Sequence, residues 1–203
     1  MTEAEWVACT DPTPMLGFLW GNASDRKLRL SAAACSRRGW GRISAPGRAA
    51  VEVAEAFADG LAGPAELRAA RQACKFAGGD AAWYAAASRA AIAARNAALS
   101  AQAGADPTPE RAAQAALLRC VFGNPFRPVT LDPALRTPTV VALAQAAYDE
   151  RQLPAGTLDA QRLAVLVDAL EEAGADPAIV GHLRSDGPHV RGCWALDLVI
   201  DRQ

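Results

Sequence analysis

Apolar residues recur every three or four positions along most of the chain, which is the spacing of an amphipathic α-helix. The segment 138–151 shows this spacing through Val140, Val141, Ala144 and Tyr148. No segment of useful length alternates apolar and polar residues as a half-buried strand does. The pattern therefore predicts an all-α protein, an irregular bundle of about nine or ten short helices. We expect them at residues 2–9, 25–38, 48–59, 65–76, 81–103, 110–122, 138–151, 157–173, 177–184 and 189–200.

Residues that start and stop helices support these boundaries. Thr2 followed by Glu5 is the pattern of a capping box, and Ser24 is placed to cap the helix at 25–38. Segment 81–103 is almost entirely alanine, so we expect one long, straight helix near the middle of the bundle. The stretch 124–137 contains three prolines and is the one long loop, a kind of segment that is often functional.

The composition fits a single folded unit. The chain has 203 residues, which is long enough to bury a core without a metal or a disulfide. Its hydrophobic fraction of 51% includes much alanine, so the core depends on a smaller set of large side chains. We expect one helical domain over 1–203, with the 124–137 loop as the boundary if two lobes exist.

Charge and hydropathy exclude several classes of partner. The 21 basic and 22 acidic residues leave a net charge of -1, without the basic excess of a nucleic-acid-binding protein, so nucleic acid is an unfavoured partner. No apolar run approaches the roughly 20 residues of a transmembrane helix. The first residues also lack the basic start of a secretory signal. We therefore expect a cytoplasmic protein with no membrane partner.

The five cysteines show no metal-binding spacing. They are odd in number and none forms a CxxC pair. In a reducing compartment they are expected to be free thiols that behave as small buried hydrophobes. On this basis the sequence predicts no cofactor and no metal.

The terminal hairpin nevertheless concentrates reactive side chains, because it holds both histidines, His182 and His189. On a helix over 189–200, His189 and Cys193 would lie four residues apart on one face, and His182 would approach across the intervening turn. A small metal or thiol site can be drawn there, although no spacing indicates a fourth ligand. The alternative is that the histidines are hydrogen-bonded parts of the structure.

The same hairpin also resembles an anion-binding helix start. His189 and Arg191 would supply cations close to free backbone N–H groups. The alternative is that Arg191 pairs with Asp186 or another acid. The ligand-binding candidates are therefore His182, His189, Arg191 and Cys193.

Two further regions are candidates for partner binding. Asn124, Phe126 and Arg127 put an aromatic ring and a cation in the proline-stiffened loop, which suits protein recognition, unless Phe126 fills the core instead. The one basic concentration would serve an accessory role on nucleic acid only if its side chains shared one face, and a solvated helix surface is the alternative. Its members are Arg26, Lys27, Arg29, Arg37, Arg38 and Arg42.

Several segments together resemble a known group of proteins. They are Asp11-Pro12 through Leu16 near the start (DPTPML), 122–129 (FGNPFRPV) and 187–194 (GPHVRGCW). With them the chain is similar, over nearly its full length, to an uncharacterised protein family expanded in planctomycete-type bacteria. The resemblance implies no activity, because none is established for the group.

Within that group, members are richer in cysteine around Cys35 and around His182. This chain has other residues where such thiols would sit, namely Ala34, Ser36, Ala175 and Leu183. The resemblance therefore gives no support to a metal or redox site at those positions.

The sequence lacks recognisable catalytic motifs, with no glycine-rich phosphate loop, GxSxG or HExxH. We therefore expect a non-catalytic helical module that binds another protein through the 124–137 loop and the terminal hairpin. The first alternative is a small ligand- or metal-binding protein or enzyme that uses the hairpin. The weaker alternative is an accessory protein associated with nucleic acid.

Overall fold

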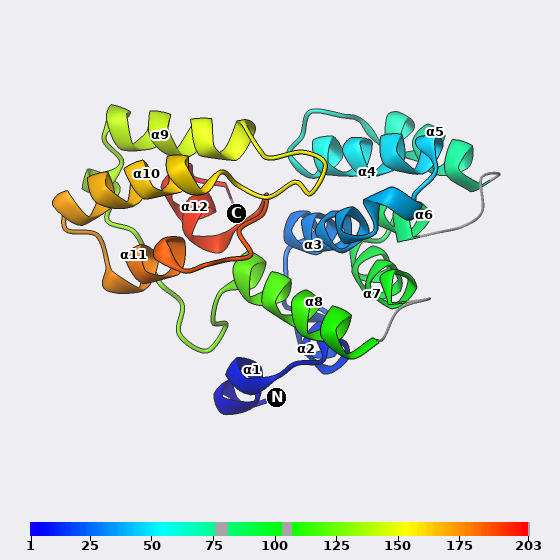
Figure 1. Ribbon diagram of the computed structural model, residues 1–203, viewed down its shortest axis with the longest axis horizontal. Helices are drawn as coiled ribbons and strands as arrows, with labels where there is room; N and C mark the ends of the chain where they lie inside the picture. Colours follow the sequence, from blue (N-terminus) through cyan, green and yellow to red (C-terminus); the bar gives the residue numbers. More distant parts are fainter. Residues whose placement is uncertain (76–80, 103–106, 203) are drawn as a thin grey trace. The chain divides into compact units, whose positions relative to one another are not determined.

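The computed structural model describes residues 1–75, 81–102 and 107–202 (Figure 1). In these ranges the chain forms twelve α-helices, nine of them with seven or more residues, and no β-strand. The predicted all-α class is therefore confirmed. The helices are α1 (Glu3–Ala8), α2 (Pro12–Leu19), α3 (Asp25–Arg38), α4 (Ala45–Ala58), α5 (Pro64–Lys75), α6 (Ala81–Ala85), α7 (Ala90–Ala101), α8 (Pro107–Phe122), α9 (Pro138–Asp149), α10 (Ala160–Glu172), α11 (Pro177–Arg184) and α12 (Trp194–Val199).

The contacts divide the chain into two compact units, which we call unit 1 (Met1–Leu118) and unit 2 (Arg119–Gln203). The division falls inside α8, a few residues before the 124–137 loop where we expected any lobe boundary. In the part of the chain that the structure describes, no helix combines the length and apolar character needed to cross a membrane.

Unit 1 is built around α3, which packs against α4, α6 and α7. Its buried core consists mainly of alanine, with Val51, Leu67 and Cys74, while Trp40, Phe57 and Trp83 pack against the rim of that core. Small side chains allow helix axes to approach closely, and the aromatic rings supply the area that alanine does not. The predicted capping box is present, since the Thr2 hydroxyl accepts from the Glu5 amide and the Glu5 carboxylate accepts from the Thr2 amide.

The long alanine-rich helix predicted over 81–103 is wrong. The chain forms α6 and α7 instead, with a break between Ala85 and Ala90, and the predicted end at Ala103 lies outside the described residues. The reason is Arg29, a buried residue of α3. Its guanidinium donates to the carbonyls of Ala85 at 3.1 Å, Ala87 at 2.7 Å and Ser88 at 3.3 Å. These hydrogen bonds satisfy carbonyls that a continuous helix would bond to amides four residues further on.

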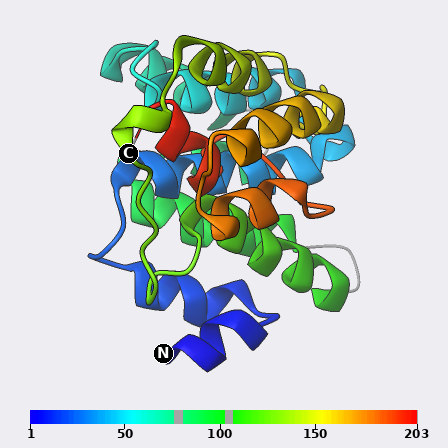
Figure 2. The same cartoon turned by 90° about the vertical axis from the view of Figure 1, so that its left-hand side faces the viewer.

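Unit 2 places α9, α10 and α11 side by side in sequence order, and both views show this stacking (Figures 1 and 2). α12 contacts α9 and α11. The core contains fully buried large side chains, including Tyr148, Leu166, Leu170, Ile179 and Leu196. Unit 2 therefore has its own core of large side chains.

The last predicted helix, 189–200, is also wrong in its first half. α12 begins only at Trp194, and residues 185–193 form a loop. Gly187 and Gly192 both have positive φ, at 90° and 85°, which is a conformation that ends a right-handed helix. A bridge pairs Thr157 with Val190, and the Leu158 amide donates to the His189 carbonyl at 2.9 Å. The loop is therefore held against the 152–158 segment.

Candidate metal centre

Four side chains of unit 2 converge although they come from distant segments of the chain. Cys120 lies in the last turn of α8, His182 in the last turn of α11, His189 in the 185–193 loop, and Cys193 directly before α12. Their potential ligand atoms all lie within 4.8 Å of one another. Zinc binds Cys sulfur at about 2.3 Å and His nitrogen at about 2.0–2.1 Å, so an ideal tetrahedron separates its ligand atoms by roughly 3.3–3.8 Å. The cluster needs little contraction to reach that geometry.

Local structure positions each ligand. Asp176 accepts from the Ala178 amide and caps α11, which fixes the helix that carries His182. Cys193 occupies the N-cap position of α12, but its side chain makes no capping hydrogen bond, so the sulfur is left to face the histidines. The Nε2 atom of His182 lies 3.2 Å from the Cys193 Sγ atom. That separation is close to the N–S distance across a zinc tetrahedron, about 3.5 Å.

Gly187 sets the approach of His189. A Cβ atom at Gly187 would lie 3.0 Å from the His189 backbone nitrogen, and its positive φ disfavours any other residue there. A Cβ atom at Gly123 would lie 3.0–3.3 Å from the Trp194 ring, which also lies 5.1 Å from the His182 ring. The two glycines therefore allow the backbone to close around the four side chains.

The hydrogen bond of His189 determines which of its nitrogens can bind a metal. Its Nε2 atom lies 3.0 Å from the Ser185 carbonyl oxygen, and because a carbonyl only accepts, Nε2 carries the proton. In the neutral ring Nδ1 is then an acceptor, and this atom is buried with no hydrogen-bond partner. A metal-bound histidine commonly donates its other N–H to a carbonyl in this way. The arrangement therefore prepares Nδ1 to act as a ligand.

The electrostatics favour the ligand form of Cys193. Burial raises the pKa of its thiol. The Cys120, His182 and His189 side chains lower that pKa by more than burial raises it, so the pKa lies well below its ordinary value. Burial lowers the pKa of His189, while Cys193 and the Ser185 carbonyl raise it more. An anionic sulfur next to histidine nitrogens is a donor set that suits a cation such as Zn²⁺. The cation binds these atoms in place of protons.

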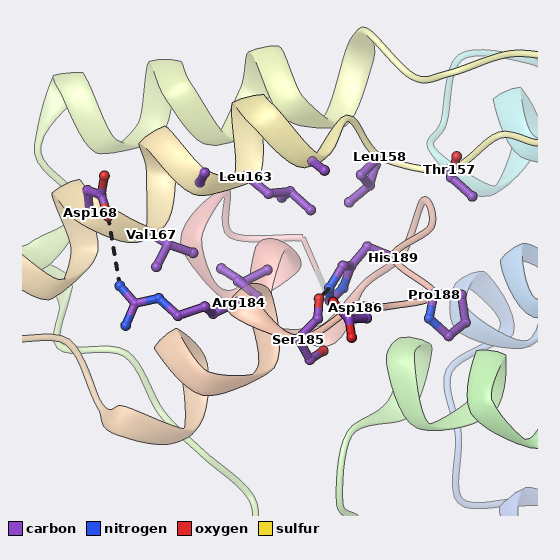
Figure 3. A pocket seen from close by; sticks show the side chains of 13 residues that line it. Thr157, Leu158, Leu163, Val167, Asp168, Arg184, Ser185, Asp186, Pro188 and His189 are labelled. Carbon is purple, nitrogen blue, oxygen red and sulfur yellow. Dashed lines mark hydrogen bonds and ion pairs between the residues drawn. The ribbon is translucent and has the colours of Figure 1, made fainter.

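A pocket of about 450 Å³ lies beside the cluster (Figure 3). Its apolar side comes from α10 through Leu163 and Val167, and its polar rim includes Arg184, Ser185 and His189. Arg184 is held by Glu171 at 2.7 Å and faces Asp168 at 3.8 Å. His189 is therefore the one cluster member that also lines this pocket.

The structure brings together three of the four predicted hairpin residues. His182, His189 and Cys193 meet, although not through the helix face that we expected, because residues 189–193 are not helical. Arg191 instead lies over the Tyr148 ring, with 5.1 Å between the guanidinium carbon and the ring centroid, and 4.0 Å from Asp149. The predicted anion-binding helix start is therefore wrong, because the helix begins after these residues.

Cys120 is the ligand that sequence reasoning missed. It lies in α8, far from the terminal hairpin along the sequence. No spacing rule connects it to the histidines. The cysteine pattern predicted free thiols, and none of the five forms a disulfide, with Cys35 and Cys74 buried among apolar residues of unit 1. The sequence offered one local feature at this position, a cysteine near the end of a predicted helix that is followed by Gly123, and this feature alone does not indicate a metal ligand.

The partner-binding candidates in the 124–137 loop form a turn. The Asn124 side chain accepts from the Phe126 amide at 3.0 Å, and the Arg127 amide donates to the Asn124 carbonyl at 3.0 Å. Phe126 is 37% exposed, so it does not fill the core as one alternative expected. The loop thus presents Phe126 at the surface of unit 2.

The basic side chains of unit 1 do not share one exposed face, as the nucleic-acid alternative required, and two of them are not on a solvated surface either. Arg29 and Arg37 are buried, and Arg37 makes two hydrogen bonds to the Glu55 carboxylate at 2.7 and 2.8 Å. Arg26 pairs with Asp59, and Arg38 pairs with Glu110 at 2.9 Å. Acids of the same unit therefore pair with three of the six basic side chains, Arg26, Arg37 and Arg38.

Comparison with known proteins gives no further assignment. No family model matches the chain, and neither a curated protein nor a solved structure matches it. The resemblance to a planctomycete-type family therefore stays a prediction, and the function rests on the chemistry of the site.

Proposed function

We propose that this protein is a zinc-binding helical protein, in which Cys120, His182, His189 and Cys193 of unit 2 hold one structural Zn²⁺ ion. The observation that carries this proposal is the convergence of four ligand atoms within 4.8 Å. One of them, His189 Nδ1, is a buried acceptor without a hydrogen-bond partner. A metal ion would satisfy that acceptor, which otherwise carries the cost of an unpaired buried polar group.

The donor set favours zinc over other metals. Two thiolates and two imidazoles suit tetrahedral Zn²⁺, whereas Mg²⁺ and Ca²⁺ prefer oxygen ligands. Four protein ligands fill the tetrahedron and leave no position for water or substrate, which is the arrangement of a structural site. The burial of Cys120, His189 and Cys193 agrees with that role.

The metal would tie together parts of unit 2 that are otherwise connected by a few contacts. It would link the end of α8 to α11, to the 185–193 loop and to the start of α12. The loop is held to the 152–158 segment by a bridge and a backbone hydrogen bond, and a metal would add a second attachment, to α8 and α11. The proposed role is therefore to fix the terminal hairpin in its folded position.

The test is the metal content of the purified protein. We expect one zinc per chain in native mass spectra recorded without chelator, and X-ray absorption with two sulfur and two nitrogen neighbours. Cys120→Ser should lose most of the zinc, whereas Cys9→Ser, which changes a thiol in unit 1, should keep it. A folded wild-type protein that takes up no zinc at micromolar concentration, or binds it equally well after Cys120→Ser, would overturn the proposal.

Cobalt substitution gives a second measurement in case Cys120→Ser fails to fold. Co²⁺ bound to the wild-type site should show the charge-transfer absorption of two thiolate ligands and the visible bands of a tetrahedral ion. An octahedral spectrum without thiolate bands would exclude the proposed ligand set.

The interaction module expected from the sequence stays a prediction. Its support is the surface position of Phe126 in a proline-stiffened turn. This is a weaker basis than four converging ligands, and the two roles are compatible because the loop and the metal ligands occupy different segments of unit 2.

A further inference from the structure

We propose that Cys120 and Cys193 form a redox switch, in which a small hydroperoxide converts them to a disulfide, expels the metal and frees one wall of the adjacent pocket. The inference rests on the proposed zinc site. It adds to that site a signal that empties it and a consequence for the neighbouring surface.

The geometry places the two sulfurs in one cluster. Cys120 and Cys193 come from opposite ends of unit 2, yet their Sγ atoms lie within 4.8 Å of each other. They are the only two of the five cysteines that belong to the cluster, and both keep their sulfurs free of disulfide bonds. A metal holds two thiolates apart at roughly 3.8 Å, whereas a disulfide needs about 2.05 Å, so the two states exclude each other.

Access to the cluster is restricted to small reagents. Cys120 is 2% exposed and Cys193 is fully buried, so a bulky oxidant has no direct route to either sulfur. The cluster approaches solvent through His182, which is half-buried, and through His189, which lines the 450 Å³ pocket (Figure 3). The 185–193 loop carries both His189 and Cys193, so displacement of the histidine exposes the sulfur behind it. Hydrogen peroxide is small enough for this route.

The reaction balances with peroxide as the only oxidant. One thiolate attacks a peroxide oxygen, the O–O bond breaks, and a sulfenic acid and hydroxide form. The second thiolate attacks the sulfenic sulfur, the S–S bond forms, and a second hydroxide leaves. In total, two thiolates lose two electrons to the peroxide, and Zn²⁺ departs with its charge unchanged because it has lost both sulfur ligands.

The consequence reaches the pocket. A disulfide would still connect α8 to the start of α12, but His182 and His189 would no longer be tied to it. The residues between the two histidines form part of the pocket wall, including Leu183, Ser185 and Pro188. Oxidation would therefore release this wall while leaving the α10 side of the pocket in place.

The test uses the wild-type zinc-loaded protein. Treatment with hydrogen peroxide should release one zinc for each disulfide formed, measured with a colorimetric zinc indicator and by peptide mapping without reduction. The map should show Cys120 joined to Cys193, and dithiothreitol with added zinc should restore the bound metal. Cys9→Ser, the matched control, should behave as the wild type does.

Hydrogen exchange reports the effect on the pocket. Amides of residues 183–190 should lose protection after oxidation, whereas those of α10 should keep theirs. The aromatic disulfide reagent DTNB, which is much larger than peroxide and must reach a buried sulfur, should release zinc more slowly than peroxide at equal concentration.

Three results would overturn the switch. These are zinc retained after peroxide, zinc lost without the Cys120–Cys193 link, and irreversible oxidation of each cysteine alone. If the reduced protein binds no zinc at all, the proposed function itself fails. If it binds zinc and keeps it under peroxide, only the switch fails.

Discussion

Unit 1 and unit 2 both bury polar side chains, but they satisfy them in different ways. In unit 1 the buried guanidinium of Arg29 donates to three carbonyls, and that of Arg37 is paired with the Glu55 carboxylate. The buried amide of Gln114 donates to the Ala98 carbonyl and accepts from Gln102. These three groups find their partners within the same unit, whereas the buried Nε atom of Arg71 has no hydrogen bond and its guanidinium lies over the Trp83 ring at 4.2 Å.

Unit 2 instead gathers four polar side chains whose partner set is incomplete. The Cys193 sulfur and the His182 nitrogen contact each other, but His189 Nδ1 has no hydrogen bond. Buried polar atoms are nearly always satisfied, so a buried acceptor without a hydrogen bond beside two sulfurs supports the proposed metal site. The contrast teaches that the kind of unsatisfied atom matters, because the guanidinium N–H of Arg71 is a donor and cannot bind a cation, whereas the imidazole Nδ1 of His189 can.

Removing the metal should have the largest effect on stability. The effect should be seen in unit 2 and not in unit 1. Structural zinc contributes about 10–16 kcal/mol of apparent binding free energy in zinc-finger peptides. Unit 2 also has its own core, so we expect chelation to lower its free energy of unfolding by roughly 5 kcal/mol. Hydrogen exchange with and without EDTA should show this loss in α11 and α12 and no change in α3 or α4. Equal loss in both units would contradict the comparison.

The buried ion pair of unit 1 should give the next largest effect. Glu55→Gln leaves Arg37 buried without a charged partner and should lower the free energy of unfolding by about 3–5 kcal/mol. Urea unfolding measures this loss. Arg38→Met, which breaks the more exposed pair with Glu110, should change stability by only about 0–1 kcal/mol. Zinc content should be unchanged in both variants.

The close approach at Gly187 should matter less, and mainly for the metal. Gly187→Ala forces a Cβ atom to 3.0 Å from the His189 backbone nitrogen at positive φ. Strain of about 1–3 kcal/mol should weaken zinc affinity roughly tenfold to hundredfold, measured by competition with a chelating dye. Gly181→Ala is the matched control, because a Cβ atom there meets nothing within 4 Å. Equal affinities in the two variants would mean that Gly187 does not position His189.

The smallest expected effect is a pH dependence in unit 1. Burial raises the pKa of Asp11, but hydrogen bonds from Thr13 and Arg111 lower it more, and the net shift is downward. Because the folded-state pKa lies below the unfolded one, this interaction stabilises unit 1 above about pH 4. The contribution is lost as the pH falls through the lowered pKa.

Asp11→Asn tests this prediction, since asparagine keeps the N-cap but removes the charge. The wild type should be more stable than the variant by up to about 1 kcal/mol at pH 6, and the difference should shrink as the pH falls below about 4. Urea unfolding over this range of pH measures it. A difference that grows on acidification would contradict the downward shift.

Local signals predicted the parts of the fold that depend on neighbouring residues. The Thr2–Glu5 capping box and the Ser24 cap of α3 are present as expected. The break between α6 and α7 was not predictable in this way, because Arg29 makes it from a helix far away in the sequence. Helix propensity gives the preference of each residue for helical backbone. It carries no information about hydrogen bonds from a guanidinium that is distant in the sequence.

The candidate site was predictable in part for the same reason. His182, His189 and Cys193 are neighbours in the sequence, so their grouping was evident even though the expected helix was wrong. Cys120 reaches them only through the packing of α8 in unit 2, which no spacing encodes. Sequence reasoning therefore found the ligands that are close together in the chain and missed the one brought in by tertiary structure.

The contacts of Arg29 also have a consequence for the order of folding events. They join residues 56 to 59 positions apart, whereas an alanine helix forms from contacts four positions apart. Residues 81–102 should therefore begin as one continuous helix and divide into α6 and α7 only when α3 docks. Pulse-labelling hydrogen exchange would detect early protection of the amides at 89–91, followed by its partial loss. In this segment the native state would then be reached by undoing a helical turn that formed first.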